Sequence, residues 1–213
     1  MKKEITIPES INDIALCRWQ RYMSIVKEDS TDDFANRKAL EVFYDIKGEY
    51  FNKLRVKDID FMISELNKAL NQKIPLIRQF ELNGILYGFV PNLDDISFGE
   101  FVDMDTNSGI EDLHKLMSIL YRPITKKKGD KYIIQSYKGI NEDLSGMLLG
   151  VAQSAYAFFF DIGLQLTSDT LKSLTPQGED QTRKLDLVRN GVGILQSIPF
   201  QMGMFLNSTK LQK

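Results

Sequence analysis

The segment 80–90 reads FELNGILYGFV, and it decides the fold of this chain. Two short apolar-rich runs of strand character flank Asn83-Gly84. Asn-Gly favours a type I′ turn, because both central residues of that turn need positive φ angles. The segment therefore predicts a β-hairpin centred on Asn83 and Gly84.

Helical patterns surround this hairpin on both sides. An acidic cluster at 28–33 supplies caps for a helix that follows it, since negative charge stabilises a helix N-terminus. Ser97 and Glu100 match a capping box, which predicts a short helix from Phe98. Apolar residues recur at three- and four-residue steps over 11–26, 34–47, 59–70 and 110–122, where Pro123 is expected to end the last of these helices.

Further elements complete a mainly α (α+β) prediction. Residues 4–7 alternate like a short strand, 126–131 predict a solvated loop, and 132–134 predict a second short pairing. Residues 144–166 predict one long, largely buried helix. The expected organisation is a helical domain with an inserted hairpin over 1–175, followed by a C-terminal helix and tail over 176–213 that contact a partner.

Composition limits the classes of function. The chain has 213 residues, 27 Lys and Arg against 29 Asp and Glu, and a net charge of −2, so it lacks the basic excess of a dedicated nucleic-acid binder. Cys17 and His114 are the only residues of their types, which excludes an intramolecular disulfide and a Cys/His metal cluster. The uncharged run 144–160 is shorter than the roughly 20 residues of a spanning helix, so no membrane span is expected.

Residues with the chemistry for catalysis are few. The carboxylates of the acidic stretch 94–105 could bind a divalent cation, but their spacing does not match a calcium loop. Roles as helix caps and turn formers explain these residues better. Asp161 interrupts an apolar run and is expected to face an Arg, a helix terminus or water, with acid/base work as the minor alternative. We therefore assign no catalytic, cofactor-binding or metal-ligating residue and expect no cofactor.

Two sets of residues are candidates for contact with a partner. The first is a basic patch, which could touch an acidic partner or come near DNA without binding it tightly. The second is a stripe of small residues spaced four apart, which lets another backbone approach closely, inside the domain or across a subunit contact. The patch comprises Arg122, Lys126, Lys127, Lys128 and Lys131, and the stripe comprises Gly146, Gly150 and Ser154.

Three segments, in this order and spacing, resemble a group of structural and assembly proteins of tailed bacteriophages with Bacteroides-type hosts, including crAss-like phages. They are ITIPES (5–10) with IALCRWQRY (14–22), FELNGILYGFVPNLDDISFGEFVD (80–103) and LMSILYRPI (116–124). The resemblance covers about residues 4–166. The chain departs from the pattern at Ala15-Leu16-Cys17, where a Thr-Leu-Gly step is expected, and after Gly178, where it is longer. No catalytic residue comes with the resemblance.

Three hypotheses follow. The first, which the resemblance implies, is a non-enzymatic component of the virion, in the tail, the neck, the head-to-tail connection or packaged cargo, made in the host bacterial cytoplasm. Its partners would be copies of itself, as in a ring, and other phage structural proteins. The second is a tail assembly chaperone that is absent from the finished particle. The third is a small enzyme that uses Asp161 or the acidic loop.

Overall fold

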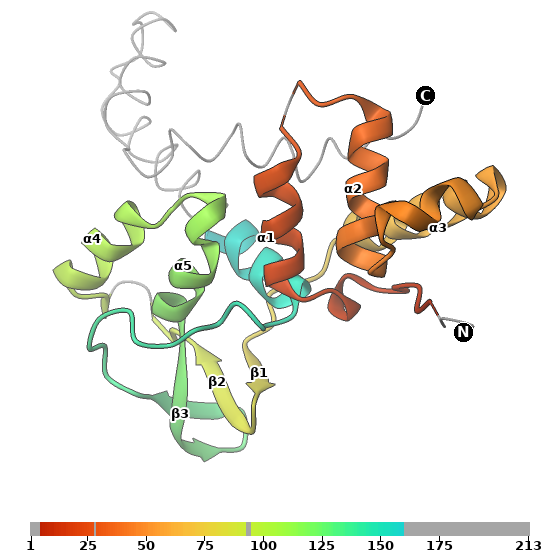
Figure 1. Ribbon diagram of the computed structural model, residues 1–213. Helices are drawn as coiled ribbons and strands as arrows, with labels where there is room; N and C mark the ends of the chain where they lie inside the picture. Colours follow the sequence, from red (N-terminus) through yellow and green to blue (C-terminus); the bar gives the residue numbers. More distant parts are fainter. Residues whose placement is uncertain (1–4, 28, 93–94, 160–213) are drawn as a thin grey trace, which may run out of the picture.

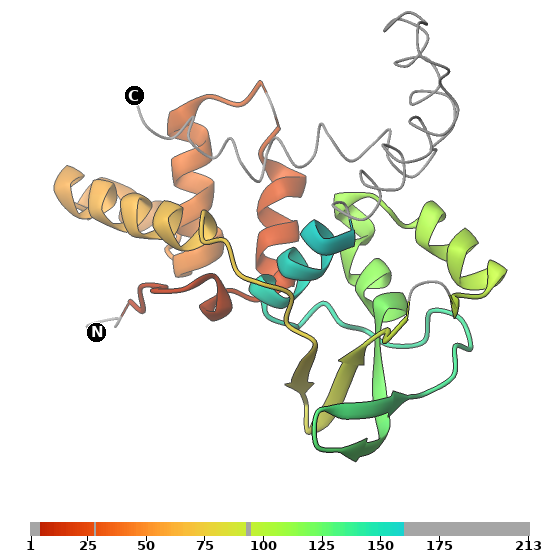
Figure 2. The same ribbon diagram turned by 180° about the vertical axis from the view of Figure 1, so that it is seen from behind.

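The structure is a computed structural model and describes residues 5–27, 29–92 and 95–159. The helices and strands in chain order are α1 (Leu16–Ile25), α2 (Asp32–Tyr44), α3 (Val56–Leu70), β1 (Gln79–Leu82), β2 (Ile85–Phe89), α4 (Phe98–Thr106), α5 (Leu113–Leu120), β3 (Tyr121–Lys128) and β4 (Lys131–Ile134), followed by helical residues 149–159. This mixture of helices and one small sheet confirms the predicted α+β class. The sheet lies below the helices in both views, with the β3–β4 hairpin farthest from them (Figures 1 and 2).

Local side-chain signals start the helices where the sequence predicts. The Thr31 hydroxyl accepts a hydrogen bond from Phe34 N at the start of α2, and Asp32 and Asp33 lie in its first turn. The helix ends at Tyr44, because the φ of 52° at Asp45 places that residue in the left-handed region, which stops helical pairing. The predicted cap of this helix is thus confirmed.

The sheet is antiparallel, with the strand order β1-β2-β3-β4. Asn83 and Gly84 connect β1 to β2 with φ angles of 52° and 78°, so the predicted hairpin is confirmed. β2 pairs with β3 although α4 and α5 lie between them in the chain. A two-residue turn at Gly129-Asp130, with φ of 60° at Gly129, connects β3 to β4.

An aromatic cluster joins the sheet to the helices. Phe80 stacks on Tyr87 with ring centroids 5.3 Å apart, and Tyr121 meets Phe80 and Phe89 edge-on at 5.1 and 5.2 Å. Phe89 in turn meets Phe158, from helical residues 149–159, at 5.7 Å. Such pairs contribute about 0.5–1.5 kcal/mol each beyond the burial of their area. The cluster therefore holds the sheet firmly against the helical part.

The N-terminal prediction is wrong in two details. Residues 5–8 form no strand; Ile5 and Ile7 instead pack on the core from an extended segment. The helix predicted over 11–26 is divided into a 3-10 turn (Ile11–Asp13) and α1, because the backbone between them pairs with residues 147–149. Leu149 N donates to Ile14 O at 2.7 Å, and Leu16 N donates to Met147 O at 2.8 Å.

Two further predictions are corrected toward the C-terminal side. The lysines at 126–128 and 131 lie in paired strands and not in a loop, and only the turn residues 129–130 connect them. The helix predicted from Leu144 begins at 149, because 145–148 form a turn and the bridge between Ala15 and Leu148. The predicted domain boundary at 175–176 and the C-terminal helix lie outside the described residues. Over the described ranges, no helix has the length and apolar character to cross a membrane.

Candidate interaction surfaces

Arg122 does not belong to the exposed basic patch that the sequence predicts, because its side chain points into the molecule. Its guanidinium Nη2 lies 3.0 Å from Glu100 Oε1, and only 13% of the Arg122 side chain and 6% of the Glu100 side chain are exposed. The guanidinium also lies over the ring of Tyr137, 5.8 Å from the ring centroid. The pair joins β3 to α4, so Arg122 supports the structure from within.

Glu100 is held by the capping box that the sequence predicts. Its Oε2 accepts hydrogen bonds from the Ser97 backbone N (2.8 Å) and hydroxyl (2.7 Å), while the Ser97 hydroxyl accepts from Glu100 N. One carboxylate thus caps α4 and neutralises Arg122. This double use fixes which face of α4 is turned toward the sheet.

The other acidic residues of this stretch have separate places. Asp103 accepts a hydrogen bond from the Tyr137 hydroxyl. Burial of the Tyr137 side chain raises the pKa of this tyrosine, and the hydrogen bond to Asp103 raises it further by a smaller amount. Asp95 accepts from the Asn92 amide at 2.7 Å, and Asp105 is exposed. Across 5–27, 29–92 and 95–159, no three His, Cys, Asp or Glu side chains gather closely enough to hold a metal ion. Asp161 lies outside the described residues.

The four lysines of the patch stay together on the surface. Lys126, Lys127, Lys128 and Lys131 are exposed around the turn of the β3–β4 hairpin, and we call them the lysine tip. They lie at the end of the sheet that points away from the helices (Figure 1). The predicted basic patch therefore separates into an exposed lysine tip and a buried Arg122.

Two residues of the small-residue stripe, Gly150 and Ser154, pack within the chain. A Cβ on Gly150 would come 2.2 Å from Asn12 Oδ1 and 2.7 Å from Ile74 Cδ1, so the absent side chain allows close packing there. The buried Ser154 hydroxyl accepts from Ile77 N at 3.2 Å and donates to Val151 O. Gly146 is exposed and precedes the helix, so the three residues do not share one helical face.

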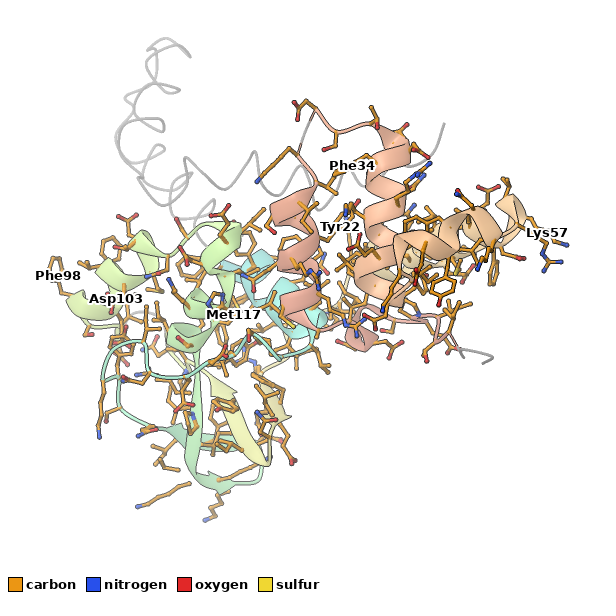
Figure 3. All side chains as sticks on the ribbon, in the orientation of Figure 1. Tyr22, Phe34, Lys57, Phe98, Asp103 and Met117 are labelled. Atoms are coloured by element: carbon orange, nitrogen blue, oxygen red, sulfur yellow. The ribbon has the colours of Figure 1, made fainter. Side chains whose placement is uncertain are left out.

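An exposed apolar stripe on α4 was missed by sequence reasoning. Phe98, Phe101 and Val102 are 82%, 45% and 41% exposed, and their spacing of three and four places them on one face, which we call the α4 face. Phe98 extends away from the molecule (Figure 3). The signal was present: if Glu100 faces inward as a cap partner and Met104 lies beside it, positions 98, 101 and 102 must face outward.

A hollow of about 320 Å³ lies elsewhere, where α1 meets the end of α2. Arg18, one of the residues that line it, donates to the carbonyl oxygens of Val42 (3.2 Å) and Phe43 (3.1 Å) and pairs with Asp45 at 3.0 Å. These contacts close the C-terminal end of α2. Arg18 therefore joins α1 to the C-terminal end of α2.

His114 and Cys17 also have ordinary surroundings. The Nδ1 of His114 lies 3.2 Å from the Gln20 amide nitrogen, which in addition donates to the backbone of the 3-10 turn Ile110–Asp112. Cys17 is exposed and has a free thiol. The surfaces with distinct character are thus the α4 face and the lysine tip.

Comparison of the chain with protein-family models, with curated proteins and with solved structures found no match in any of the three.

Proposed function

We propose that this chain is a non-enzymatic structural component of a tailed-phage virion, acting through protein–protein contacts in a multi-copy assembly. The observation that carries the proposal is the α4 face: three large apolar side chains exposed side by side on one helix. Contiguous exposed apolar patches on soluble domains are typical of surfaces that bind other proteins. The tail, the neck, the head-to-tail connection and packaged cargo are the places where such contacts repeat.

The placement of candidate chemical groups supports this proposal. The side chains of Glu100 and Arg122 are only 6% and 13% exposed, and they neutralise each other across α4 and β3. Asp103 is committed to Tyr137. These groups hold the α4 face in position, as a scaffold does, and their geometry fits positioning better than bond making or breaking.

Two of the three segments that carry the resemblance to phage proteins lie next to each other in the fold. Its second segment (80–103) forms β1, β2 and the start of α4, and its third (116–124) forms α5 and the start of β3. These segments meet in the aromatic cluster and in the Glu100–Arg122 pair. The second and third segments therefore build one unit, the sheet that carries α4, whereas the first segment (5–10 with 14–22) lies in the N-terminal residues and α1.

Near-neutral net charge fits a place beside the path of DNA. A wall that bound phosphate tightly would hold the genome back, because each neutralised phosphate adds to salt-dependent affinity. The lysine tip offers four positive charges, enough for weak and transient proximity to DNA, within a chain of net charge −2. Positions that line or flank the DNA route are therefore favoured.

The proposal is tested by quantitative mass spectrometry of purified phage particles. We expect the chain in virions at a fixed copy number relative to the major capsid protein. A small fixed number indicates a ring, and a large variable number indicates cargo. Presence in infected cells together with absence from particles would overturn the proposal and support the assembly-chaperone alternative.

The enzyme alternative has its own test. Phage carrying Asp161→Asn should form particles with unchanged infectivity if this carboxylate does no chemistry. Glu100 is left unchanged in this test, because it is the counter-charge of the largely buried Arg122 and its substitution would destabilise the fold. Loss of infectivity with a normally folded Asp161→Asn protein would count against a purely structural role.

A further inference from the structure

Charges separate by sign along the part of the chain that carries the two candidate surfaces. Residues 91–112 contain seven Asp and Glu and no Lys or Arg, whereas residues 122–138 contain six Lys and Arg and one Asp. The first segment includes α4 and the second the β3–β4 hairpin. Glu100 and Arg122 already pair within the chain. Asp95, Asp105 and Glu111 of the acidic segment and the lysine tip of the basic segment remain exposed.

Apolar side chains accompany the charges on both surfaces. On α4, Asp105 continues the stripe of Phe98, Phe101 and Val102, since it lies seven residues after Phe98 and therefore on the same side of the helix.

On the hairpin, Ile133 is 59% exposed and pairs in register with Lys126. Ile85, at the outer end of β2, is 43% exposed. Tyr132 packs over Gly88, so by strand alternation Ile133 and Ile85 belong to the opposite face of the sheet. Each surface thus combines exposed apolar groups with charges that are mainly of one sign, with Asp130 in the hairpin turn as the exception among the lysines, as interface cores and rims do.

The two surfaces lie apart in one molecule. Both views place the hairpin tip well below α4, with the body of the sheet between them (Figures 1 and 2). A surface of one sign on one copy is therefore available to the surface of opposite sign on another copy.

We propose that the α4 face of one copy binds the lysine tip of the next copy in a head-to-tail contact. Because the two surfaces differ, the contact is heterologous, and repeating it closes a ring or extends a filament. The inference rests on the proposed function and deepens it, since it names the contact through which copies assemble. Charge complementarity selects a second copy as the occupant, because the chain itself carries both halves.

The test uses the full-length chain and sedimentation velocity with light scattering. Exposed charges are screened over about 10 Å at 0.1 M salt and about 3 Å at 1 M salt. We therefore expect oligomers at low salt and a fall of at least about tenfold in the association constant when NaCl is raised from about 50 mM to about 500 mM. A chain that stays monomeric at low salt, at concentrations of about 0.5 mM where contacts of about 1 mM Kd become visible, overturns the inference.

Variants of the two surfaces locate the contact. The tip variant is Lys126→Glu with Lys128→Glu, and the α4 variant is Phe98→Ser with Phe101→Ser. All four positions are exposed, so folding should persist, and circular dichroism checks it. Each variant alone should be monomeric, because each has lost one half of the contact.

Mixing the two variants gives the decisive result. The tip variant keeps an intact α4 face and the α4 variant keeps an intact lysine tip, so an equimolar mixture should form 1:1 dimers and nothing larger. Monomers in the mixture, or self-association of either variant alone, would overturn the head-to-tail arrangement.

Control variants change the same chemistry elsewhere. Lys47→Glu with Lys57→Glu makes the same charge change, and Phe61→Ser removes an aromatic ring that is 54% exposed on α3. Lys57 lies at the opposite end of the molecule from Phe98 (Figure 3). These variants should assemble like the parent chain, and if they lose assembly, the specific contact is refuted. Detection in virions with a failed mixing result would leave the proposed function standing and remove only this contact.

Discussion

Glu100 and Arg122 form an ion pair of 3.0 Å in which both side chains are largely buried. The pair spans α4 and β3, and the same carboxylate accepts two hydrogen bonds from Ser97. Turning this edge of α4 inward leaves Phe98, Phe101 and Val102 outward. The α4 face is therefore exposed because Glu100, on the other side of the helix, pairs with Arg122 in the interior.

Removing this carboxylate should strongly destabilise the fold. Glu100→Ala leaves Arg122 buried without its counter-charge and removes the capping box, so we expect the free energy of unfolding to fall by about 3–5 kcal/mol. Urea unfolding at neutral pH measures the change. The control is Asp58→Asn, which breaks the exposed Arg55–Asp58 pair and should cost no more than about 1 kcal/mol. Equal losses in the two variants would show that the burial of the first pair has no energetic role.

Substitution by alanine should lower the stability of the fold at Gly150 but not at Gly146. Gly150→Ala forces a Cβ to within 2.2 Å of Asn12 Oδ1, so we expect a loss of about 1–3 kcal/mol, as for other overpacked sites. The nearest atom to a Cβ on Gly146 is Leu82 Cδ1 at 3.8 Å, an ordinary contact, so Gly146→Ala should be tolerated. Thermal unfolding compares the two. Similar melting temperatures would contradict the tight packing at Gly150.

Gly88 offers a comparable test inside the sheet. A Cβ there would lie 2.5 Å from Tyr132 Cε2, and the Tyr132 hydroxyl donates to Phe89 O at 2.8 Å. Gly88→Ala must displace this ring, and we expect a cost of about 1–3 kcal/mol. Gly99→Ala is the matched control, since a Cβ there meets nothing closer than Ser97 Oγ at 4.0 Å and Ala favours the helix by about 0.5–1 kcal/mol. If Gly88→Ala unfolds at the same urea concentration as the parent chain, Tyr132 does not restrain this position.

The features that could be predicted correctly from the sequence are those determined by contacts between residues no more than four positions apart in the chain. The turn at Asn83-Gly84 and the capping box of Ser97 and Glu100 each depend on neighbouring residues, and both occur as expected. The small-residue stripe is less local: Gly150 needs its missing side chain because of Asn12, far away in the chain. Spacing alone predicted close approach but could not name the neighbour.

The candidate surfaces were harder to predict, for two physical reasons. Lys126, Lys127 and Lys128 are exposed on a strand that has no buried face at this end, so no apolar alternation marks them as strand residues. Arg122 stands close to them in sequence, yet its position opposite Glu100 depends on the pairing of β2 with β3 across two intervening helices. That non-local pairing divides the predicted patch into an exposed and a buried part.

Buried tyrosines should make the fold sensitive to alkaline pH. Burial raises the pKa values of Tyr22, Tyr87 and Tyr156 from 10.0 to about 12, and in Tyr87 a hydrogen bond to Glu142 adds to the effect. In the unfolded chain a tyrosine loses its proton near 10. Between pH 10 and 12 the unfolded state therefore binds fewer protons than the folded state, and stability falls as the pH rises. Below pH 10 the contribution of these groups is fully present.

A substitution at Tyr44 measures how much this one tyrosine contributes to the loss of stability at alkaline pH. Burial, with a smaller effect from the charge of Glu65, raises its pKa to about 12, and its hydroxyl donates to Met62 O at 2.6 Å. Tyr44→Phe should lower the free energy of unfolding by about 1 kcal/mol at neutral pH, because this hydrogen bond is lost. From pH 10 to 12, however, the variant should lose less stability than the parent chain, because Phe cannot ionise and the unfolded state gains nothing from position 44. Urea unfolding across this range measures both slopes, with Tyr50→Phe, at a side chain 48% exposed, as the control. Parallel slopes for Tyr44→Phe and the parent chain would show that Tyr44 keeps an ordinary titration in the folded state.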